Sequence, residues 1–206
     1  MMELDAIEFQ RKSGQEEIIC PDKNRKLLDF WSWAYSDLVS NTDRGSIAEY
    51  LIALACNIED NPRISWNAYD LLTNDGIKIE VKSSGYLQTW KQKDYSKPIF
   101  GIPKTLAWDY RENVYEIDRK RQADVYVFAL HAHKDKATVN PLDTRQWEFY
   151  VLSSKILDEK VRNSKNISLK RILDLGGVKC KFDEIMVTIK SANSSESKQI
   201  ESNRNQ

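Results

Sequence analysis

Two short segments with alternating apolar residues, joined by a tight-turn sequence, constrain the fold more than any other feature. Residues 64–72 (ISWNAYDLL) and 77–83 (IKIEVKS) flank Thr73-Asn74-Asp75-Gly76. An Asn-Asp-Gly sequence favours a hairpin turn, because glycine readily adopts the positive φ that such a turn requires. In the second segment the isoleucines and the valine should face a core, whereas Glu80 and Lys82 should share the opposite face. The sequence therefore predicts an antiparallel hairpin with one charged face.

Helical and strand patterns surround this hairpin. Apolar residues at helical spacing predict helices over 26–40 and 44–56, the second with N-cap oxygens at Asn41, Thr42 and Asp43. Further strands are expected at 97–102, 123–131 and 147–152, short helices at 116–122, 153–160 and 168–175, and a strand or helix at 180–189. This order predicts an α/β fold, in which a central mixed sheet is flanked by helices, within one domain over 1–190. Residues 191–206 have almost no apolar content and should form a disordered polar tail.

Composition excludes several classes of protein. With 41% hydrophobic and 30% charged residues, the chain is neither fibrous nor wholly disordered. No apolar run approaches the roughly 20 residues that cross a bilayer, and the acidic N-terminus lacks the pattern of a secretory signal. The three cysteines lie far apart in the sequence and form no CxxC pair, which argues against a zinc site and a disulfide framework. A cytoplasmic location without a membrane partner is expected by default.

The overall charge gives no general attraction to nucleic acid, because 31 basic and 31 acidic side chains cancel. Any affinity for nucleic acid must therefore come from an uneven distribution of charge. Residues 78–104 contain six lysines against Glu80 and Asp94, which makes this segment modestly basic. A solvated lysine-rich surface would look the same, so the segment alone does not decide between the two interpretations.

Asp70, Glu80 and Lys82 form the candidate catalytic group. Pairing across the turn should bring residue 70 close to residue 80, so that the two carboxylates could share a divalent cation, with the Val81 carbonyl as an additional candidate ligand. Such a cation neutralises charge on phosphoryl oxygens and activates water, which is the chemistry of phosphodiester hydrolysis. Lys82 lies roughly 6–7 Å beyond Glu80 on the same face of the strand. Its ammonium could orient the attacking water or stabilise the developing negative charge.

The tripeptide [D/E]-x-K is by itself a weak signal. It recurs at Asp118–Lys120, Asp158–Lys160 and Glu196–Lys198 without a comparable setting. The alternative interpretation of residues 78–82 is a solvated strand face, on which charges alternate only because the other face is core. What distinguishes the first case is the hairpin, the aspartate on the partner strand and the amphipathic helix that precedes both.

This pattern resembles the PD-(D/E)xK superfamily of restriction-endonuclease-like nucleases. The resemblance is carried by Tyr69-Asp70, nine intervening residues and Glu80-Val81-Lys82, and by residues 44–49, which resemble the first core helix of the superfamily. Tyr69 replaces the name-giving proline. The resemblance covers about residues 42–152 and implies an αβββαβ core with a central mixed sheet.

The resemblance also implies an activity and a site. Asp70 and Glu80 would bind Mg²⁺ or Mn²⁺, Glu49 would reach the metal directly or through water, and Lys82 would assist the nucleophile. The expected function is a metal-dependent nuclease acting on DNA, and the superfamily suggests a bacterial restriction or defence system as its setting. A homodimer would supply the two sites needed to cut both strands of a duplex.

The segment that follows the active strand contains weaker candidates for nucleic-acid contacts. Its polar and aromatic groups could reach phosphates or bases, although ordinary loop chemistry would explain them equally; they are Ser83, Ser84, Gln88, Trp90, Lys91 and Lys93. Trp90 and Trp108, both in polar loops, are the tryptophans best suited to stacking on bases. The other tryptophans considered are expected to pack in or near the core; they are Trp31, Trp33, Trp66 and Trp147.

Two further features allow other interpretations. His131 and His133 resemble a metal-binding pair, but without a third ligand a surface role is expected for both. The alternative function is a catalytically silent domain on the same fold that binds nucleic acid or a protein partner. Loss of Asp70, Glu80 or Lys82 would have favoured it, and all three are present.

Overall fold

The centre of the molecule is a five-stranded mixed sheet. The computed structural model describes residues 4–204, with side chains described to residue 194. The strand order in the sheet is β11-β9-β8-β4-β3. These strands are β3 (Leu71–Leu72), β4 (Lys78–Gly85), β8 (Val125–His131), β9 (Trp147–Ser153) and β11 (Val178–Cys180). Only β4 and β8 run parallel, and the other neighbours are antiparallel. The predicted central mixed sheet flanked by helices is confirmed.

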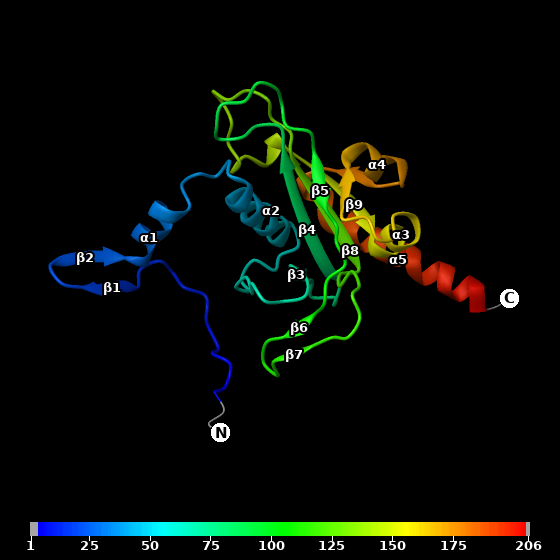
Figure 1. Cartoon of the computed structure of the whole chain (residues 1–206), viewed down its shortest axis with the longest axis horizontal. Helices are drawn as coiled ribbons and strands as arrows, with labels where there is room; N and C mark the ends of the chain where they lie inside the picture. Colours follow the sequence, from blue (N-terminus) through cyan, green and yellow to red (C-terminus); the bar gives the residue numbers. More distant parts are fainter. Residues whose placement is uncertain (1–3, 205–206) are drawn as a thin grey trace.

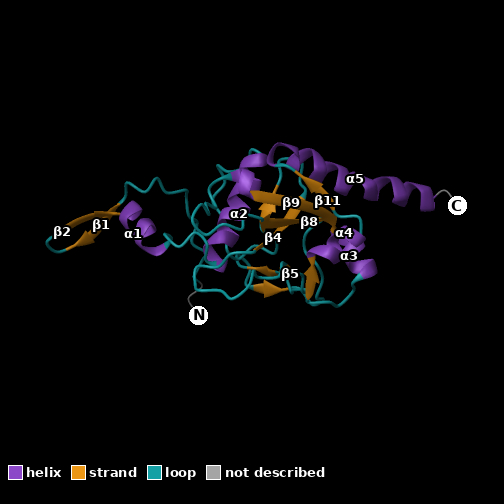
Figure 2. Cartoon of the chain, turned by 90° about the horizontal axis from the view of Figure 1, so that it is seen from above, coloured by secondary structure: helices purple, strands orange, loops and turns teal. Residues whose placement is uncertain are grey.

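Helices and a small second sheet cover the two faces of the central sheet (Figure 2). The elements on one face are α2 (Asn41–Ala55) and α5 (Ile185–Arg204); those on the other are α3 (Ser154–Lys160), α4 (Leu169–Asp174) and the pair β5 (Ile99–Gly101) and β10 (Asn166–Ser168). Alternation along β8 builds both cores: Val125 and Val127 face the α2 layer, and Tyr126 and Phe128 face the opposite layer. All seven residues of β8 are buried, because both faces of this central strand are covered.

Several predicted elements are confirmed close to their expected bounds. The buried strands at 123–131 and 147–152 correspond to β8 and β9, and the short helices at 153–160 and 168–175 correspond to α3 and α4. The second short helix ends at Gly176, whose φ of +86° suits glycine, and the Gly177 amide donates to the Ile172 carbonyl at 2.9 Å. The segment at 180–189 contains the last residue of β11, a 3-10 turn at Phe182–Glu184 and the start of α5.

Three predicted elements differ from the structure. Only Leu71 and Leu72 of the expected strand 64–72 pair with β4; the preceding residues form turns and bends. The expected helix at 116–122 is absent from this described segment, which is extended and is bridged to Thr105 at Lys120. It follows a hairpin, β6 (Trp108–Asp109) and β7 (Val114–Tyr115), in which cross-strand aromatic packing overrides the helical pattern. The expected strand at 97–102 exists as β5, but it pairs with β10 and lies outside the central sheet.

The two predicted N-terminal helices are both present with shifted ends. The helix expected at 26–40 is the shorter α1 (Leu27–Ala34). The N-cap of α2 is Ser40, one residue before the expected Asn41–Asp43 group, because the Ser40 hydroxyl accepts a hydrogen bond from the Asp43 amide at 3.1 Å.

The N-terminal region extends away from the body of the molecule (Figure 1). It consists of the hairpin β1 (Glu17–Cys20) and β2 (Lys23–Lys26) followed by α1. In α1, which is described in full, no residue is buried. Trp33 is 83% exposed, so its expected packing near the core is wrong, whereas Trp147, at 6% exposed, is in the core as expected.

Helix α5 extends into the segment for which the polar composition predicts disorder. It runs to Arg204, so helix replaces the disordered tail expected at 191–206 as far as that residue, and 205–206 lie outside the described residues. Ile185 and Ile189 are fully buried and anchor the start of this helix. Each further residue then adds one hydrogen bond to a helix that is already nucleated. Across residues 4–204, no helix combines the length and the apolar content needed to span a membrane.

His131, at the end of β8, is fully buried rather than at the surface as expected. Its ring packs against that of Trp147, with centroids 4.9 Å apart. Burial, together with the nearby positive charge of Arg44, lowers the pKa of His131 from 6.5 to about 4. His133 is partly exposed, and its Nε2 lies 2.8 Å from the Thr138 hydroxyl. The burial of His131 follows from its place on a strand that is covered on both faces.

The buried neutral His131 should make the folded state sensitive to acid. As the pH falls below about 6.5, the unfolded chain binds this proton while the folded chain does not, so the free energy of unfolding should drop by about 2 kcal/mol by about pH 5. Urea unfolding at several pH values would measure the drop. A His131→Gln variant should show a flatter profile over this range, and an identical profile would contradict this assignment.

Candidate active site

The turn between β3 and β4 brings Asp70 against the charged strand. Gly76 has a φ of +82° and donates its amide to the Thr73 carbonyl at 2.9 Å. The Thr73 hydroxyl accepts from the Ile77 amide at 2.9 Å, and the Thr73 amide donates to the Ile77 carbonyl at 3.0 Å, which closes the turn. The Asp70 amide then donates to the Ile79 carbonyl at 3.1 Å. The expected proximity of residues 70 and 80 is therefore present.

Asp70 lies on an open edge of β4. Because β3 is only two residues long, β4 has no strand neighbour beyond Ile79 on this side within the described part of the chain. The exposed backbone is used by a side chain instead: the Val81 amide donates to Asp70 Oδ2 at 2.7 Å. The amide and carbonyl of one strand residue point to the same side. The Val81 carbonyl is therefore directed towards the edge that Asp70 occupies.

Glu80 and Lys82 share the opposite face of β4 from the core residues Ile79 and Val81, as the alternation predicts. Lys82 Nζ lies 2.5 Å from Glu80 Oε1, and the two side chains are 28% and 19% exposed. Glu80 is paired in register with Tyr126 of β8, whose ring belongs to the core beneath this face. The ion pair is thus largely shielded from solvent but still accessible.

Glu49 of α2 approaches the same edge of the sheet, and Arg63 is bound to it. The side chain of Glu49 is only 13% exposed, and both of its carboxylate oxygens accept from the Arg63 guanidinium, through Nε and through Nη2 at 3.0 Å. Arg63 Nη1 also donates to the Ser65 hydroxyl at 3.1 Å. Arg63 could not be predicted from the sequence, because a single arginine in an irregular segment carries no local signal. The sequence offers one hint, which is that Glu49, Asp70 and Glu80 together carry more negative charge than Lys82 alone can balance.

These charges act on one another. Burial raises the pKa of Glu80, the negative charge of Asp70 raises it further, and Lys82 opposes both. Burial also raises the pKa of Glu49, against the hydrogen bonds from Arg63. Burial lowers the pKa of Lys82, but the carboxylates of Glu80 and Asp70 outweigh this effect, and the net pKa is raised. The site therefore disfavours negative charge on Glu80 and Glu49, and an added cation would offset this cost.

The donor atoms suit a hard divalent cation in kind, since they are carboxylate oxygens and one backbone carbonyl. Each carboxylate nevertheless has another partner in this conformation: Lys82 for Glu80, Arg63 for Glu49 and the Val81 amide for Asp70. Among the described residues, no three acidic, histidine or cysteine side chains are gathered closely enough to enclose an ion. A cavity of about 560 Å³ borders the site and is lined by Glu49, Arg63 and Asp70 among others. There is thus space beside Glu49 and Asp70 in which the ion pair of Glu49 with Arg63 can open.

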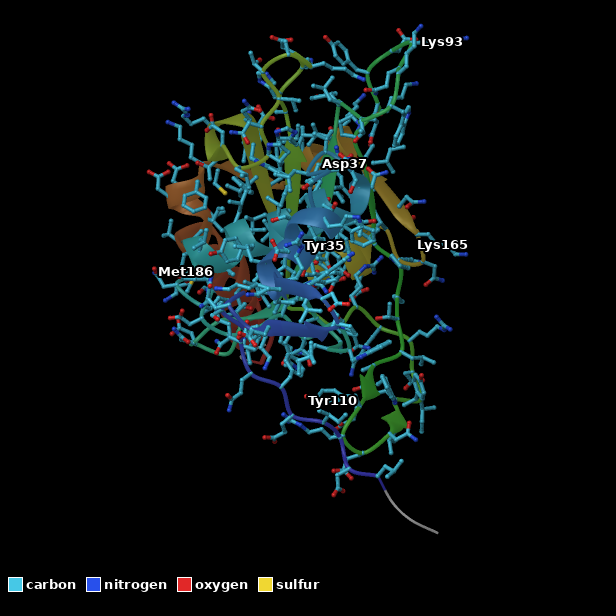
Figure 3. All side chains as sticks on the ribbon, turned by 90° about the vertical axis from the view of Figure 1, so that its left-hand side faces the viewer. Tyr35, Asp37, Lys93, Tyr110, Lys165 and Met186 are labelled. Carbon is cyan, nitrogen blue, oxygen red and sulfur yellow. The ribbon has the colours of Figure 1, made fainter. Side chains whose placement is uncertain are left out.

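The weaker nucleic-acid candidates do not form one surface with the carboxylates. Gln88 is buried, and its side chain donates to the Ser96 hydroxyl at 3.1 Å, so it supports the loop instead of facing a ligand. Ser83 and Ser84 are half-buried within β4. The other three candidates, Trp90, Lys91 and Lys93, are exposed on the loop beyond the C-terminal end of β4. Figure 3 shows Lys93 at one extremity of the molecule.

A buried arginine fixes that loop to α2. Arg44 is 1% exposed and donates from Nη1 to the Leu87 carbonyl at 2.9 Å. The guanidinium passes directly over Gly85, where a Cβ would lie 2.7 Å from Nη1. Because Gly85 has no side chain, the C-terminal end of β4 can pack closely against α2.

Two glycine substitutions should separate this packing from ordinary helix propensity. Gly85→Ala should lower the free energy of unfolding by about 1–3 kcal/mol, because the buried guanidinium has to move. Gly45→Ala is the matched control within α2: its Cβ would lie 3.8 Å from the Ser83 hydroxyl, an ordinary contact. It should stabilise the protein by about 0.5–1 kcal/mol. Chemical denaturation measures both, and equal effects would contradict the proposed close approach.

Comparison with known proteins identifies the family of the chain. The model of the family described as bacteriophage T4 endonuclease IV matches residues 20–171, which is 152 of the 206 residues. The matched range contains Glu49, Asp70, Glu80 and Lys82. A search of curated proteins found no match. Because the family model covers well over half of the sequence, this chain belongs to the bacteriophage T4 endonuclease IV family.

Proposed function

We propose that this protein is a divalent-metal-dependent endonuclease that hydrolyses phosphodiester bonds in DNA, with Asp70, Glu80 and Lys82 as its catalytic residues. Membership of an endonuclease family supplies the class of reaction, which is phosphodiester hydrolysis. The observation that carries the site is the contact of Asp70 with the Val81 amide, between Glu80 and Lys82 on the open edge of β4.

Asp70, Glu80 and the Val81 carbonyl would hold Mg²⁺ or Mn²⁺, and Glu49 would reach the ion directly or through water. When bound, such an ion neutralises charge on the phosphoryl oxygens and lowers the pKa of water. In the metal-free structure the neighbouring carboxylates outweigh burial and raise the pKa of Lys82, which favours its protonated form. A charged Lys82 would orient the attacking water or stabilise negative charge on the phosphoryl group.

The assignment to the PD-(D/E)xK superfamily is part of this proposal. It is supported by the order α2, β3, β4 and by the placement of Asp70, Glu80 and Lys82 on that unit. The remainder departs from an αβββαβ order. The connection from β4 to the parallel strand β8 spans residues 86–124, all of them described, and contains short strands but no helix. The connection from β8 to β9 contains only the 3-10 turn Thr144–Gln146. The catalytic unit therefore carries the assignment.

A catalytically silent domain is the competing function. It would have no need to keep two carboxylates and a lysine shielded together, since such groups repel or lose hydration unless compensated. The paired arrangement of Glu80 with Lys82, beside Asp70, favours the enzyme. Assays of cleavage and of metal binding separate the two.

Cleavage should depend on the proposed residues and not on similar tripeptides elsewhere. The wild type should convert supercoiled plasmid DNA to nicked or linear forms with Mg²⁺ or Mn²⁺, and gel electrophoresis would follow the conversion. Asp70→Asn and Lys82→Ala should each reduce the rate by about a hundredfold or more. Asp118→Asn and Lys160→Ala, at exposed positions of the other [D/E]-x-K sequences, should cleave as the wild type does. Equal cleavage by Asp70→Asn and the wild type would refute this site.

Metal affinity gives a test that is independent of catalysis. Isothermal titration with Mg²⁺ should show weaker binding for Asp70→Asn and Glu80→Gln than for the wild type. Arg63→Ala should bind Mg²⁺ more tightly, by up to about fivefold, because the half-exposed pair between Arg63 and Glu49 no longer has to open. Weaker binding by Arg63→Ala would show instead that Arg63 holds Glu49 in place for the metal.

A further inference from the structure

Three aromatic side chains form an exposed cluster beside the candidate site. Trp66 and Trp108 meet edge to face, with ring centroids 5.5 Å apart and planes at 88°. Trp108 and Tyr115 stack across the β6–β7 hairpin, with centroids 5.9 Å apart and planes at 19°. These three residues are called the aromatic platform below. The platform joins two segments that are distant in sequence, the irregular stretch 64–70 and the hairpin.

The platform leaves much of its ring surface in water. Trp66 is 65% exposed and Tyr115 is 61% exposed, whereas Trp147, which also stacks on an aromatic neighbour, is 6% exposed in the core. The expectation that Trp66 packs in the core is therefore wrong. Leaving large apolar rings in water is unfavourable, and contiguous exposed apolar surface marks binding sites in folded proteins. The hairpin also exposes Val114 and so buries little of itself.

Short segments connect the platform to the carboxylate site. Trp66 lies four residues before Asp70 in the same irregular segment. On the hairpin side, Tyr115 adjoins Glu116, whose carboxylate is close enough to feel the charge of Lys78. Lys78 begins β4, two residues before Glu80, and its Nζ lies 5.5 Å from the centroid of the Tyr69 ring.

The figures show where the β6–β7 hairpin, which carries Trp108 and Tyr115, lies in the molecule. Figure 1 shows the β6–β7 hairpin next to the end of the sheet at which β4 begins. In Figure 3, Tyr110 at the turn of this hairpin lies in the lower part of the molecule, far from Lys93 at the top. The platform and the basic loop that follows β4 are therefore separate surfaces.

We propose that the aromatic platform binds a nucleobase of the substrate by stacking on Trp66 and Tyr115, and that it thereby helps to select which phosphodiester reaches Glu80 and Lys82. This inference rests on the proposed endonuclease function. Aromatic rings stack on any base, since every base has a π-face. Lys78 shares the face of β4 with Glu80, and its ammonium would meet a phosphate of the same strand. Aromatic surface together with an adjacent cation suits a nucleotide better than it suits a purely apolar partner.

Binding measured without cleavage tests the platform. In a Lys82→Ala background with Mg²⁺, fluorescence anisotropy of a labelled single-stranded oligonucleotide gives the dissociation constant. Trp66→Ala and Tyr115→Ala should each weaken binding by about tenfold, and Trp66→Phe should retain most of the affinity. Trp33→Ala is the matched control, because Trp33 is 83% exposed on α1 and lies outside the platform. Unchanged melting temperatures would show that the variants are folded, as is expected for exposed positions.

A strand that lacks bases separates stacking from other effects. The wild-type platform should bind the base-containing oligonucleotide about tenfold more tightly than an abasic sugar-phosphate strand of equal length, and Trp66→Ala should remove this difference. An equal loss of affinity for both strands would overturn the proposal, since it would indicate an effect on the backbone or on folding. The proposal also fails if Trp66→Ala abolishes self-association of the protein without changing base-dependent binding, because a second copy would then cover the platform.

These measurements distinguish failure of the platform from failure of the proposed function. If a protein with an intact Lys82 does not cleave DNA, yet binds bases through Trp66, the nuclease assignment falls and the platform stands. If it cleaves DNA, but Trp66→Ala leaves base-dependent binding unchanged, the nuclease assignment stands and the platform falls.

Discussion

The candidate site depends on a concentration of negative charge at one open strand edge. Burial raises the cost of ionising Glu80 and Glu49, and the negative charge of Asp70 adds to it. The ion pairs of Lys82 with Glu80 and of Arg63 with Glu49 offset this cost. An edge of this kind would usually be covered or paired with another strand. Here the shortness of β3 leaves the backbone of Val81 available to a side chain, and that gap defines the site.

A rigid framework is needed to hold like charges together. β4 lies between β3 and the fully buried strand β8, and the parallel pairing with β8 extends over seven residue pairs from Ile79 to Gly85. Helix α2 packs through Ala48 and Ile52 on the face of β4 that carries Ile79 and Val81. This packing determines where Glu49 reaches the edge. The contact of Arg44 with Gly85 adds a second attachment between α2 and the same strand. Glu49 and Glu80 therefore belong to well-packed elements, α2 and β4, and Asp70 is hydrogen-bonded to β4.

The proposed function combines the reaction of the endonuclease family with the groups around this strand edge. The endonuclease family supplies the phosphodiester as the bond to be broken. In the proposed mechanism, the carboxylates would supply affinity for a cation and Lys82 would supply positive charge. The aromatic platform would add recognition of a base without a dedicated reader domain, because it is assembled from a loop and a hairpin of the catalytic domain itself.

Local rules determined the parts of the site that lie close together in the sequence. The Thr73–Gly76 turn and the alternation in β4 were sufficient to place Asp70 beside Glu80, with Lys82 on the same face, because hairpin geometry depends on few residues. The buried strands β8 and β9 were equally evident from their apolar content. The parallel pairing of β4 with β8 was not evident, since the packing of the whole sheet and not the strand's own sequence selects a parallel partner.

Only the tertiary structure decided the contacts between distant segments. Arg63 binds Glu49 across fourteen residues of sequence, and Trp66 meets Trp108 from a separate loop. His131 became buried because both faces of β8 are covered, although its polarity suggested the surface. The sequence by itself determined which charged groups share a strand face and which strands form the core. Long-range packing decided which basic side chains balance those charges and which aromatic rings cluster near them. No local sequence pattern predicts such packing.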